Sequence, residues 1–206
     1  HTQCNFGARV MGTEAAQQCG DFIVSRFREY GATVTEQKCS VTLYDGTQVP
    51  ARNIIASINP DQLDRILFCA HWDSRPWADH DPDEANRHTP VPAANDGASG
   101  VAVLLELCRL LQQQPVTRGI DFVCFDAEDA GTPEWAEEPA DGRDTWCLGS
   151  AYWARQAVES GYKARYGVLL DMVGGRGCTF AREQVSLQYA KPVVDLIWHL
   201  AIQLGY

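Results

Sequence analysis

Apolar residues recur along the chain with two different spacings, and each spacing predicts one type of secondary structure. Helical spacing predicts helices over residues 13–30, 98–113, 150–159 and 193–204. Thr13 has the short polar side chain that commonly caps the start of a helix. Each of these helices is expected to bury one apolar face against a common core.

Apolar and β-branched runs between those helices predict strands, and the Asp45-Gly46 pair predicts a tight hairpin turn. The expected strands are the two arms of the hairpin within residues 40–49 and the segments 52–58, 65–70, 119–126 and 166–173. Strands that alternate with helices are typical of α/β proteins. The predicted fold class is therefore a three-layer α/β/α fold with a mixed, centrally parallel β-sheet.

Composition and charge narrow the class of protein further. The 206 residues are 45% apolar and 21% charged, which suits one globular domain spanning residues 1–206. No run of about 18 apolar residues is present, so no membrane-spanning segment is expected. The formal charge of −10 argues against nucleic acid or an anionic membrane as the main partner.

Polar side chains follow three of the predicted central strands, where ligands collect in α/β sheets. Most of these polar residues also have a simpler, structural explanation. Asp96 could cap the helix that follows it, and His71 could be a hydrogen-bonded core histidine. Glu128 and Asp129 could belong to a solvated loop. Asp171 is expected to be partly buried, because apolar residues follow it directly.

Together these residues predict a metal site at one edge of the sheet. Clustered carboxylates repel one another, and a divalent cation is the simplest way to compensate them. One imidazole with several carboxylates is a donor set that suits zinc. In the adjacent pair Glu128-Asp129, one side chain can bind the metal while the other remains a general acid/base.

Five stretches resemble the zinc-dependent exopeptidases, namely the M28-type aminopeptidases and the related glutaminyl cyclases. They are AHWDS (70–74), ANDGASGVAVLLEL (94–107), FDAEDAG (125–131), LGSAYWA (148–154) and GVLLDMVG (167–174). The extended segment HWDSRPWADHD and the Trp-rich loop EWAEEPADGRDTWCLGS make the chain most similar to bacterial-type glutaminyl cyclases. The resemblance covers nearly the whole chain and implies a zinc exopeptidase-like catalytic domain.

The resemblance also implies roles for individual residues. Asp96 and Asp129 would bind zinc, Glu128 would be the catalytic acid/base, and Asp171 would hold the substrate amine and the catalytic glutamate. Trp135 would stack on the glutaminyl side chain. We further predict that His71 lies in the substrate pocket or binds a second metal ion. Asp73 and Asp126 are predicted to support the metal ligands from behind.

Two departures from the family pattern stand out. Asp129 occupies a ligand position that is often glutamate, so the side chain that would reach the metal is shorter by one methylene group. The last zinc ligand of the family is a histidine located after the helix that here ends at Leu204, and His199 inside that helix does not replace it. We therefore expect residues 1–206 to lack the C-terminal part of the domain and, as they stand, to be unable to complete a catalytic zinc site.

Three functions are compatible with these residues. The first is a glutaminyl-peptide cyclotransferase with one Zn²⁺, which converts the N-terminal glutamine of peptides or proteins to pyroglutamate and releases ammonia. The second is an aminopeptidase with two zinc ions, and the third is a metal-free interaction domain. The resemblance to bacterial members of the family implies export to the bacterial periplasm or cell surface. The oligomeric state is left open.

Overall fold

The computed structural model describes residues 1–206 and divides into two compact units. His1–Gly174 contains the β-sheet and every candidate site residue, and Gly175–Tyr206 contains helix α5 (Gln184–Gln203). The expectation of a single domain over residues 1–206 stays a prediction.

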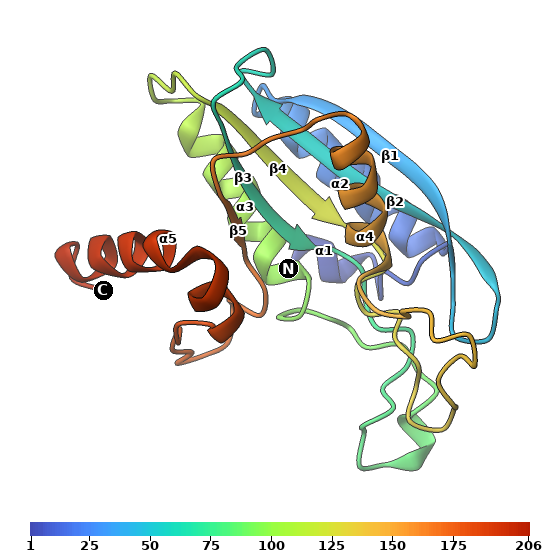
Figure 1. Ribbon diagram of the computed structural model, residues 1–206. Helices are drawn as coiled ribbons and strands as arrows, with labels where there is room; N and C mark the ends of the chain where they lie inside the picture. The colour runs from blue at the N-terminus through green and yellow to red at the C-terminus, as the bar shows by residue number, and fades with distance from the viewer. The chain divides into compact units, whose positions relative to one another are not determined.

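A five-stranded mixed sheet forms the centre of the larger unit (Figure 1). Its strands are β1 (Thr33–Thr42), β2 (Gln48–Ile58), β3 (Arg65–His71), β4 (Gly119–Phe125) and β5 (Gly167–Leu169), in the order β1-β2-β4-β3-β5. The pairs β1–β2 and β2–β4 are antiparallel, whereas β4–β3 and β3–β5 are parallel. The parallel strands β3, β4 and β5 therefore end at the same edge of the sheet.

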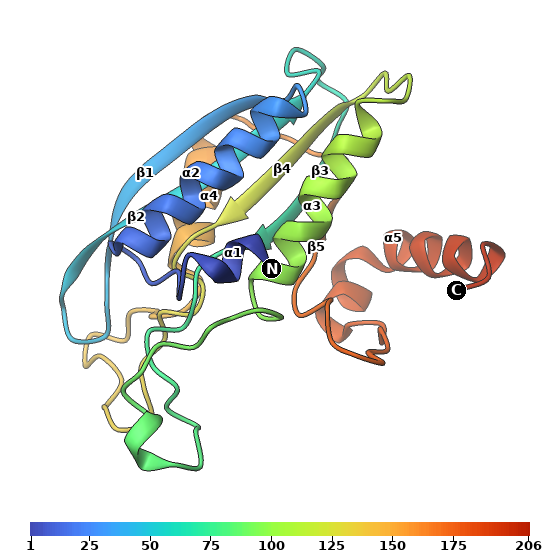
Figure 2. The ribbon, with the colours of Figure 1, turned by 180° about the vertical axis from the view of Figure 1, so that it is seen from behind.

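Helices cover both faces of this sheet. Helices α2 (Glu14–Glu29) and α3 (Ala98–Leu111) lie on one face, and α4 (Leu148–Glu159) lies on the other (Figure 2). Two short helices, α1 (Thr2–Asn5) and the 3₁₀ turn η1 (Glu84–Asn86), complete the unit. The predicted three-layer α/β/α fold class is confirmed.

The buried faces of α2 and α3 have the apolar spacing that predicted them. In α2 the Thr13 hydroxyl accepts a hydrogen bond from the Ala16 N–H, as an N-cap does, and Ile23 and Phe27 are fully buried. Phe27 packs on Phe122 of β4 with ring centroids 5.7 Å apart. Burial of these apolar side chains fixes the helical layer against the central strands.

Strand β5 is shorter than the expected strand over residues 166–173. The Leu170 N–H still donates to the Cys69 carbonyl at 2.8 Å, but Met172 has a φ of +50° and turns the chain away. In this sheet β5 pairs only with β3. Asp171 therefore stands on an edge, and its side chain is 42% exposed, that is, partly buried as expected.

Helix α5 extends further toward the N-terminus than the expected segment 193–204. Its backbone departs from helical geometry at Ala190, two residues before Pro192. Proline removes one backbone donor and clashes with the preceding turn, which accounts for the kink. No helix in the structure is both long and apolar enough to cross a membrane.

A buried ion pair joins the strands at the end of the sheet opposite to the candidate site. The Arg65 guanidinium on β3 donates to both oxygens of Asp121 on β4, and Asp121 is 3% exposed. Ser57 and Tyr162 donate to the same carboxylate at 2.6 and 2.7 Å. Burial opposes ionisation of Asp121, but the hydrogen bonds from Arg65 and its neighbours hold its pKa below the ordinary value.

We expect Asp121→Asn to lower the free energy of unfolding by about 3 kcal/mol, because Arg65 would remain buried without its counter-charge. The contribution of the wild-type pair is present above about pH 4 and lost as the pH falls through the depressed pKa of Asp121, so the variant should lose part of this acid sensitivity. Urea unfolding between pH 3 and pH 7 measures both effects. Asp64→Asn is the matched control, since Asp64 forms its ion pairs, with Arg118 and Arg165, on the surface. Equal stability of the two variants would contradict this account.

Candidate active site

The candidate site lies where β3, β4 and β5 end and where α3 begins. His71 is the last residue of β3, and it pairs in register with Phe125, the last residue of β4. The loops over residues 72–97 and 126–147 leave these strands together and run side by side (Figure 1). The topology therefore brings side chains from distant parts of the sequence to one edge.

His71 is the centre of the cluster and is 2% exposed. Its Nε2 atom lies 2.8 Å from Asp96 Oδ1 and 3.4 Å from Asp171 Oδ1. Its Nδ1 atom lies 3.2 Å from Asp73 Oδ1 and 3.9 Å from Glu128 Oε2. One imidazole thus faces four carboxylates, so the explanation of His71 as an ordinary core histidine is insufficient.

Asp96 does not cap the helix that follows it. The N-cap of α3 is Gly97, with a φ of +89°, and no side chain caps this helix end. A Cβ atom on Gly97 would lie 2.8 Å from the Asp73 carbonyl oxygen, so only glycine fits here. This turn leaves the Asp96 carboxylate free to face His71.

Asp73 positions both members of the acidic pair. One of its oxygens accepts a hydrogen bond from the Glu128 N–H, and the other accepts from the Asp129 N–H, each at 3.1 Å. Asp73 is completely buried and also touches His71. A single carboxylate therefore connects the β3 loop to the β4 loop at the site.

Three side chains meet closely enough to hold one metal ion. Ligand atoms of His71, Asp96 and Asp129 all lie within 4.8 Å of one another. Ligand atoms around a tetrahedral zinc are about 3.4 Å apart, given bonds of about 2.1 Å, so a small side-chain adjustment brings this set into range. An imidazole with two carboxylates also matches zinc chemically.

The electrostatics of the cluster favour a cation. Burial and the neighbouring carboxylates Glu128, Asp96 and Asp73 raise the pKa of Asp129 to about 8. Burial would lower the pKa of His71, but its hydrogen bonds to Asp171, Asp73 and Asp96 raise it overall. The contact with His71 in turn lowers the pKa of Asp171. In the absence of a metal, retained protons compensate the carboxylates, and a divalent cation would replace them.

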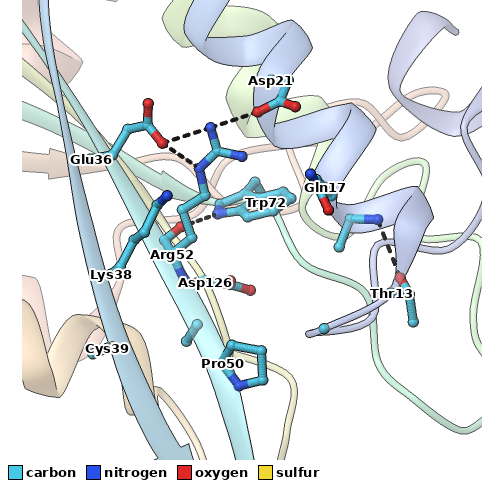
Figure 3. A pocket seen from close by; sticks show the side chains of 13 residues that line it. Thr13, Gln17, Asp21, Glu36, Lys38, Cys39, Pro50, Arg52, Trp72 and Asp126 are labelled. Carbon is cyan, nitrogen blue, oxygen red and sulfur yellow. Dashed lines mark hydrogen bonds and ion pairs between the residues drawn. The ribbon is translucent and has the colours of Figure 1, made fainter.

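Asp126 faces away from this cluster. Its carboxylate accepts hydrogen bonds from the N–H groups of Arg52 and Ala127. Together with Trp72 it lines a cavity of about 510 Å³ between α2 and the β1–β2 hairpin (Figure 3). Burial and the charge of Asp73 raise the pKa of Asp126 to about 8. Its hydrogen bond from the Ala127 N–H holds a residue that directly precedes Glu128 and has a φ of +53°.

Figure 3 also shows how the wall of this cavity is fixed. The Arg52 guanidinium forms ion pairs with Asp21 of α2 and Glu36 of β1 at 2.8 and 2.7 Å. The Trp72 indole N–H donates to the Arg52 carbonyl at 3.1 Å. Trp72 lies between His71 and Asp73 in the chain, so this contact anchors the strand end that carries the site.

Trp135 lies in the second loop, half-exposed at 44%. Its ring contacts His88 and Trp77, with centroids 4.2 and 6.1 Å away. These contacts place Trp135 in an aromatic group that joins the two loops.

Arg75 organises both loops, although the sequence patterns gave it no role. Its guanidinium lies over the Trp146 ring at 4.7 Å and donates to the backbone carbonyls of Asp129 and Gly131. It also forms an ion pair with Asp79. The motif HWDSRPWADHD contains Arg75, but only the folded loop shows that its side chain reaches across to residues 129–131.

The model of peptidase family M28 matches residues 53–206. The chain belongs to peptidase family M28. This confirms the resemblance seen in the sequence motifs, and it places the chain in a family of enzymes.

Solved structures of two kinds resemble the whole chain. A Zn-dependent exopeptidase from Parabacteroides distasonis is 48% identical, with a TM-score of 0.95. A glutaminyl cyclase from Bacteroides thetaiotaomicron, bound to N-acetylhistamine, is 47% identical, with a TM-score of 0.94. Each match covers 100% of this chain and 70% of the other. Zinc-dependent enzymes are thus among its relatives.

Curated relatives are more distant. Aminopeptidase YwaD of Bacillus subtilis is 29% identical over 157 residues, which are 74% of this chain and 28% of that protein. The uncharacterised protein YfbL of Escherichia coli is 37% identical over 109 residues, which are 53% of this chain and 31% of that protein. The chain therefore spans about a third of the length of these relatives.

Zinc binding to the full-length protein should release protons, because the raised pKa of Asp129 keeps its carboxyl protonated at pH 7 without metal. The apparent zinc affinity should therefore rise as the pH increases from about 6 to about 8. Isothermal titration calorimetry in buffers of different ionisation enthalpy measures the number of protons released. Asp126→Asn is the control, because Asp126 has a similarly raised pKa but faces away, and it should leave that number unchanged. A binding heat independent of the buffer would contradict the prediction.

Asp73→Asn should weaken zinc binding by about 10- to 100-fold, because an amide cannot accept the Glu128 and Asp129 N–H groups on both of its polar atoms. The affinity can be measured by competition with a chromogenic zinc chelator. Asp79→Asn, at another buried acid of the same loop, tests whether any loss of a buried acid has this effect. Unchanged affinity of the Asp73 variant would show that Asp73 does not position the ligands.

Proposed function

We propose that the protein is a zinc-dependent glutaminyl-peptide cyclotransferase that converts N-terminal glutamine of peptides or proteins to pyroglutamate and releases ammonia. The observation that carries the proposal is whole-chain similarity at 46–48% identity to glutaminyl cyclases from three bacteria. The cluster of His71, Asp96 and Asp129, with Glu128 beside it, supports it chemically. Export to the bacterial periplasm or cell surface is part of this proposal.

Asp96 and Asp129 are the proposed protein ligands of the metal within this chain. The resemblance assigns a further ligand to a histidine that is not among residues 1–206. When bound, zinc supplies Lewis acidity that makes the γ-carbonyl carbon of glutamine more electrophilic. Asp73 keeps the Asp129 backbone in place by accepting its N–H.

Glu128 is the proposed acid/base. Its carboxylate takes a proton from the substrate α-amine as that nitrogen attacks the γ-carbonyl carbon, and a ring C–N bond forms. It then delivers the proton to the γ-amide nitrogen, the old C–N bond breaks, and ammonia leaves. Because Glu128 and Asp129 are adjacent, Asp129 can bind the metal while Glu128 stays free to transfer the proton.

Other residues hold the substrate. Asp171 lies across His71 from Glu128 and has a depressed pKa, so it stays ionised and can accept a hydrogen bond from the α-amine. Trp135 is proposed to contact the glutaminyl side chain. Because the nucleophile belongs to the substrate, aromatic side chains that exclude water favour cyclisation over hydrolysis.

An aminopeptidase with two zinc ions is the second candidate. A specific observation favours it: His71 is one of the three side chains that meet, and its Nε2 atom lies 2.8 Å from Asp96. His71 and Asp96 would hold one ion, and Asp96 would also contribute to the second. A structure described as a leucine aminopeptidase precursor from Bacteroides thetaiotaomicron is also 47% identical. In this mechanism Glu128 would activate water.

The two candidates give different products from one peptide. The full-length protein with zinc should convert a peptide beginning Gln-Ala to a product lighter by one ammonia, which mass spectrometry detects. Glu128→Gln should lower kcat by at least about 100-fold, because the proton transfer is lost. Glu138→Gln, in the same loop, is the matched control.

Release of the first residue would favour the aminopeptidase and contradict the cyclase. Neither product, from zinc-loaded full-length protein, would contradict both functions. Zinc content measured by mass spectrometry on the same sample separates one ion from two.

A further inference from the structure

Cys147 lies against the candidate acid/base, although the motif that contains it, EWAEEPADGRDTWCLGS, gave it no role. Its Sγ atom is 3.4 Å from Glu128 Oε1, a distance at which a thiol donates a hydrogen bond to a carboxylate. The other oxygen, Oε2, points toward His71, 3.9 Å from Nδ1. The carboxylate is thus contacted by the thiol on one side and faces the cluster with the other.

The backbone holds Cys147 in register with Glu128. The Cys147 N–H donates to the Glu128 carbonyl, and the Leu148 N–H donates to the Ala127 carbonyl, both at 2.9 Å. Cys147 itself has a φ of +55° and precedes α4. A non-glycine residue in this left-handed conformation is uncommon, and here it directs the chain into the helix beside Glu128.

Two glycines let the Cys147 segment approach the loop after β4 closely. A Cβ atom on Gly149 would lie 2.0 Å from the Asp126 carbonyl oxygen. A Cβ atom on Gly131 would lie 1.7 Å from the Trp146 ring, which also packs against the Arg75 guanidinium. Both contacts require glycine. Close packing therefore fixes the chain just before and just after Cys147, and with it the position of the thiol.

From this arrangement we propose that Cys147 is a positioning residue for Glu128: its S–H group donates to Oε1 and holds the carboxylate with Oε2 toward the substrate. The proposal rests on the acid/base role proposed for Glu128. Orienting one oxygen limits rotation of a long side chain and keeps the reactive oxygen near the proton that it transfers.

The protonation state of the thiol agrees with this role. Partial burial and the charge of Glu128 raise the pKa of Cys147 to about 11. At neutral pH the group is therefore a thiol that carries its proton, and it can donate. A thiolate at the same place would repel the carboxylate.

The kinetic test compares Cys147→Ala with Cys147→Ser in the full-length zinc-loaded protein. Alanine removes the donor and should lower kcat by about 5- to 20-fold with KM changed less than about twofold. Serine keeps a donor and should retain kcat within about twofold of wild type. Cys39→Ala, which removes a thiol on β1, is the control and should behave as wild type. Unchanged kcat in the alanine variant, or equal losses with alanine and serine, would overturn the proposal.

A second measurement tests the contact without relying on activity. Cys147 is exposed, so iodoacetamide can reach it, and peptide mass spectrometry follows the alkylation of each cysteine separately. Glu128→Gln removes the adjacent charge and should speed alkylation of Cys147 by about threefold or more, because more thiolate forms at pH 8. The half-buried Cys4 and Cys39 are internal controls whose rates should not change.

The two measurements separate this inference from the proposed function. If the wild-type protein releases an amino acid rather than ammonia, the cyclase proposal fails, while the same variants still test Cys147 on the observed reaction, in which Glu128 is again the acid/base. If it releases neither, the alkylation rate alone decides whether Glu128 and Cys147 interact. An unchanged rate in Glu128→Gln would overturn the inference in every case.

Discussion

The Asp73 carboxylate is the interaction on which the rest of the site depends. It accepts the N–H groups of both Glu128 and Asp129, and it touches the His71 imidazole. Without it, the Arg75 hydrogen bonds to the Asp129 and Gly131 carbonyls would still tie the two loops together, but nothing would hold the Glu128 and Asp129 N–H groups. Through this carboxylate, the segment after β3 fixes the orientation of Glu128 and Asp129, which follow β4.

This geometry has an electrostatic consequence that agrees with the family assignment. Bringing several carboxylates to one edge raises the pKa of Asp129 and keeps protons in the cluster. The protein tolerates this cost because a cation can take the place of those protons. The donor set, an imidazole with two carboxylates, agrees with the zinc-dependent relatives in peptidase family M28.

Much of the fold and part of the site could be predicted from the sequence, for one physical reason. Burial imposes a period on apolar residues, so the helices, the strands and the polar residues at strand ends are visible as patterns. His71, Asp96 and Asp129 were placed at one edge in this way, and the structure brings them together. Their roles as ligands stay predictions.

The remaining features depend on loop conformations that have no period. Gly131 and Gly149 allow backbone approaches that bring Trp146 and Cys147 to the acidic loop, and nothing in local sequence marks those contacts. Arg75 acts through carbonyl groups about 55 residues further along the chain, a kind of contact for which the sequence gives no signal.

The most direct test of the account is anomalous diffraction at the zinc edge from crystals of the full-length protein grown with zinc. The account predicts a zinc peak bound by the carboxylates of Asp96 and Asp129, at about 2.0–2.2 Å from their oxygens. A zinc-loaded protein with no peak at these carboxylates, or with its zinc held elsewhere, would contradict it.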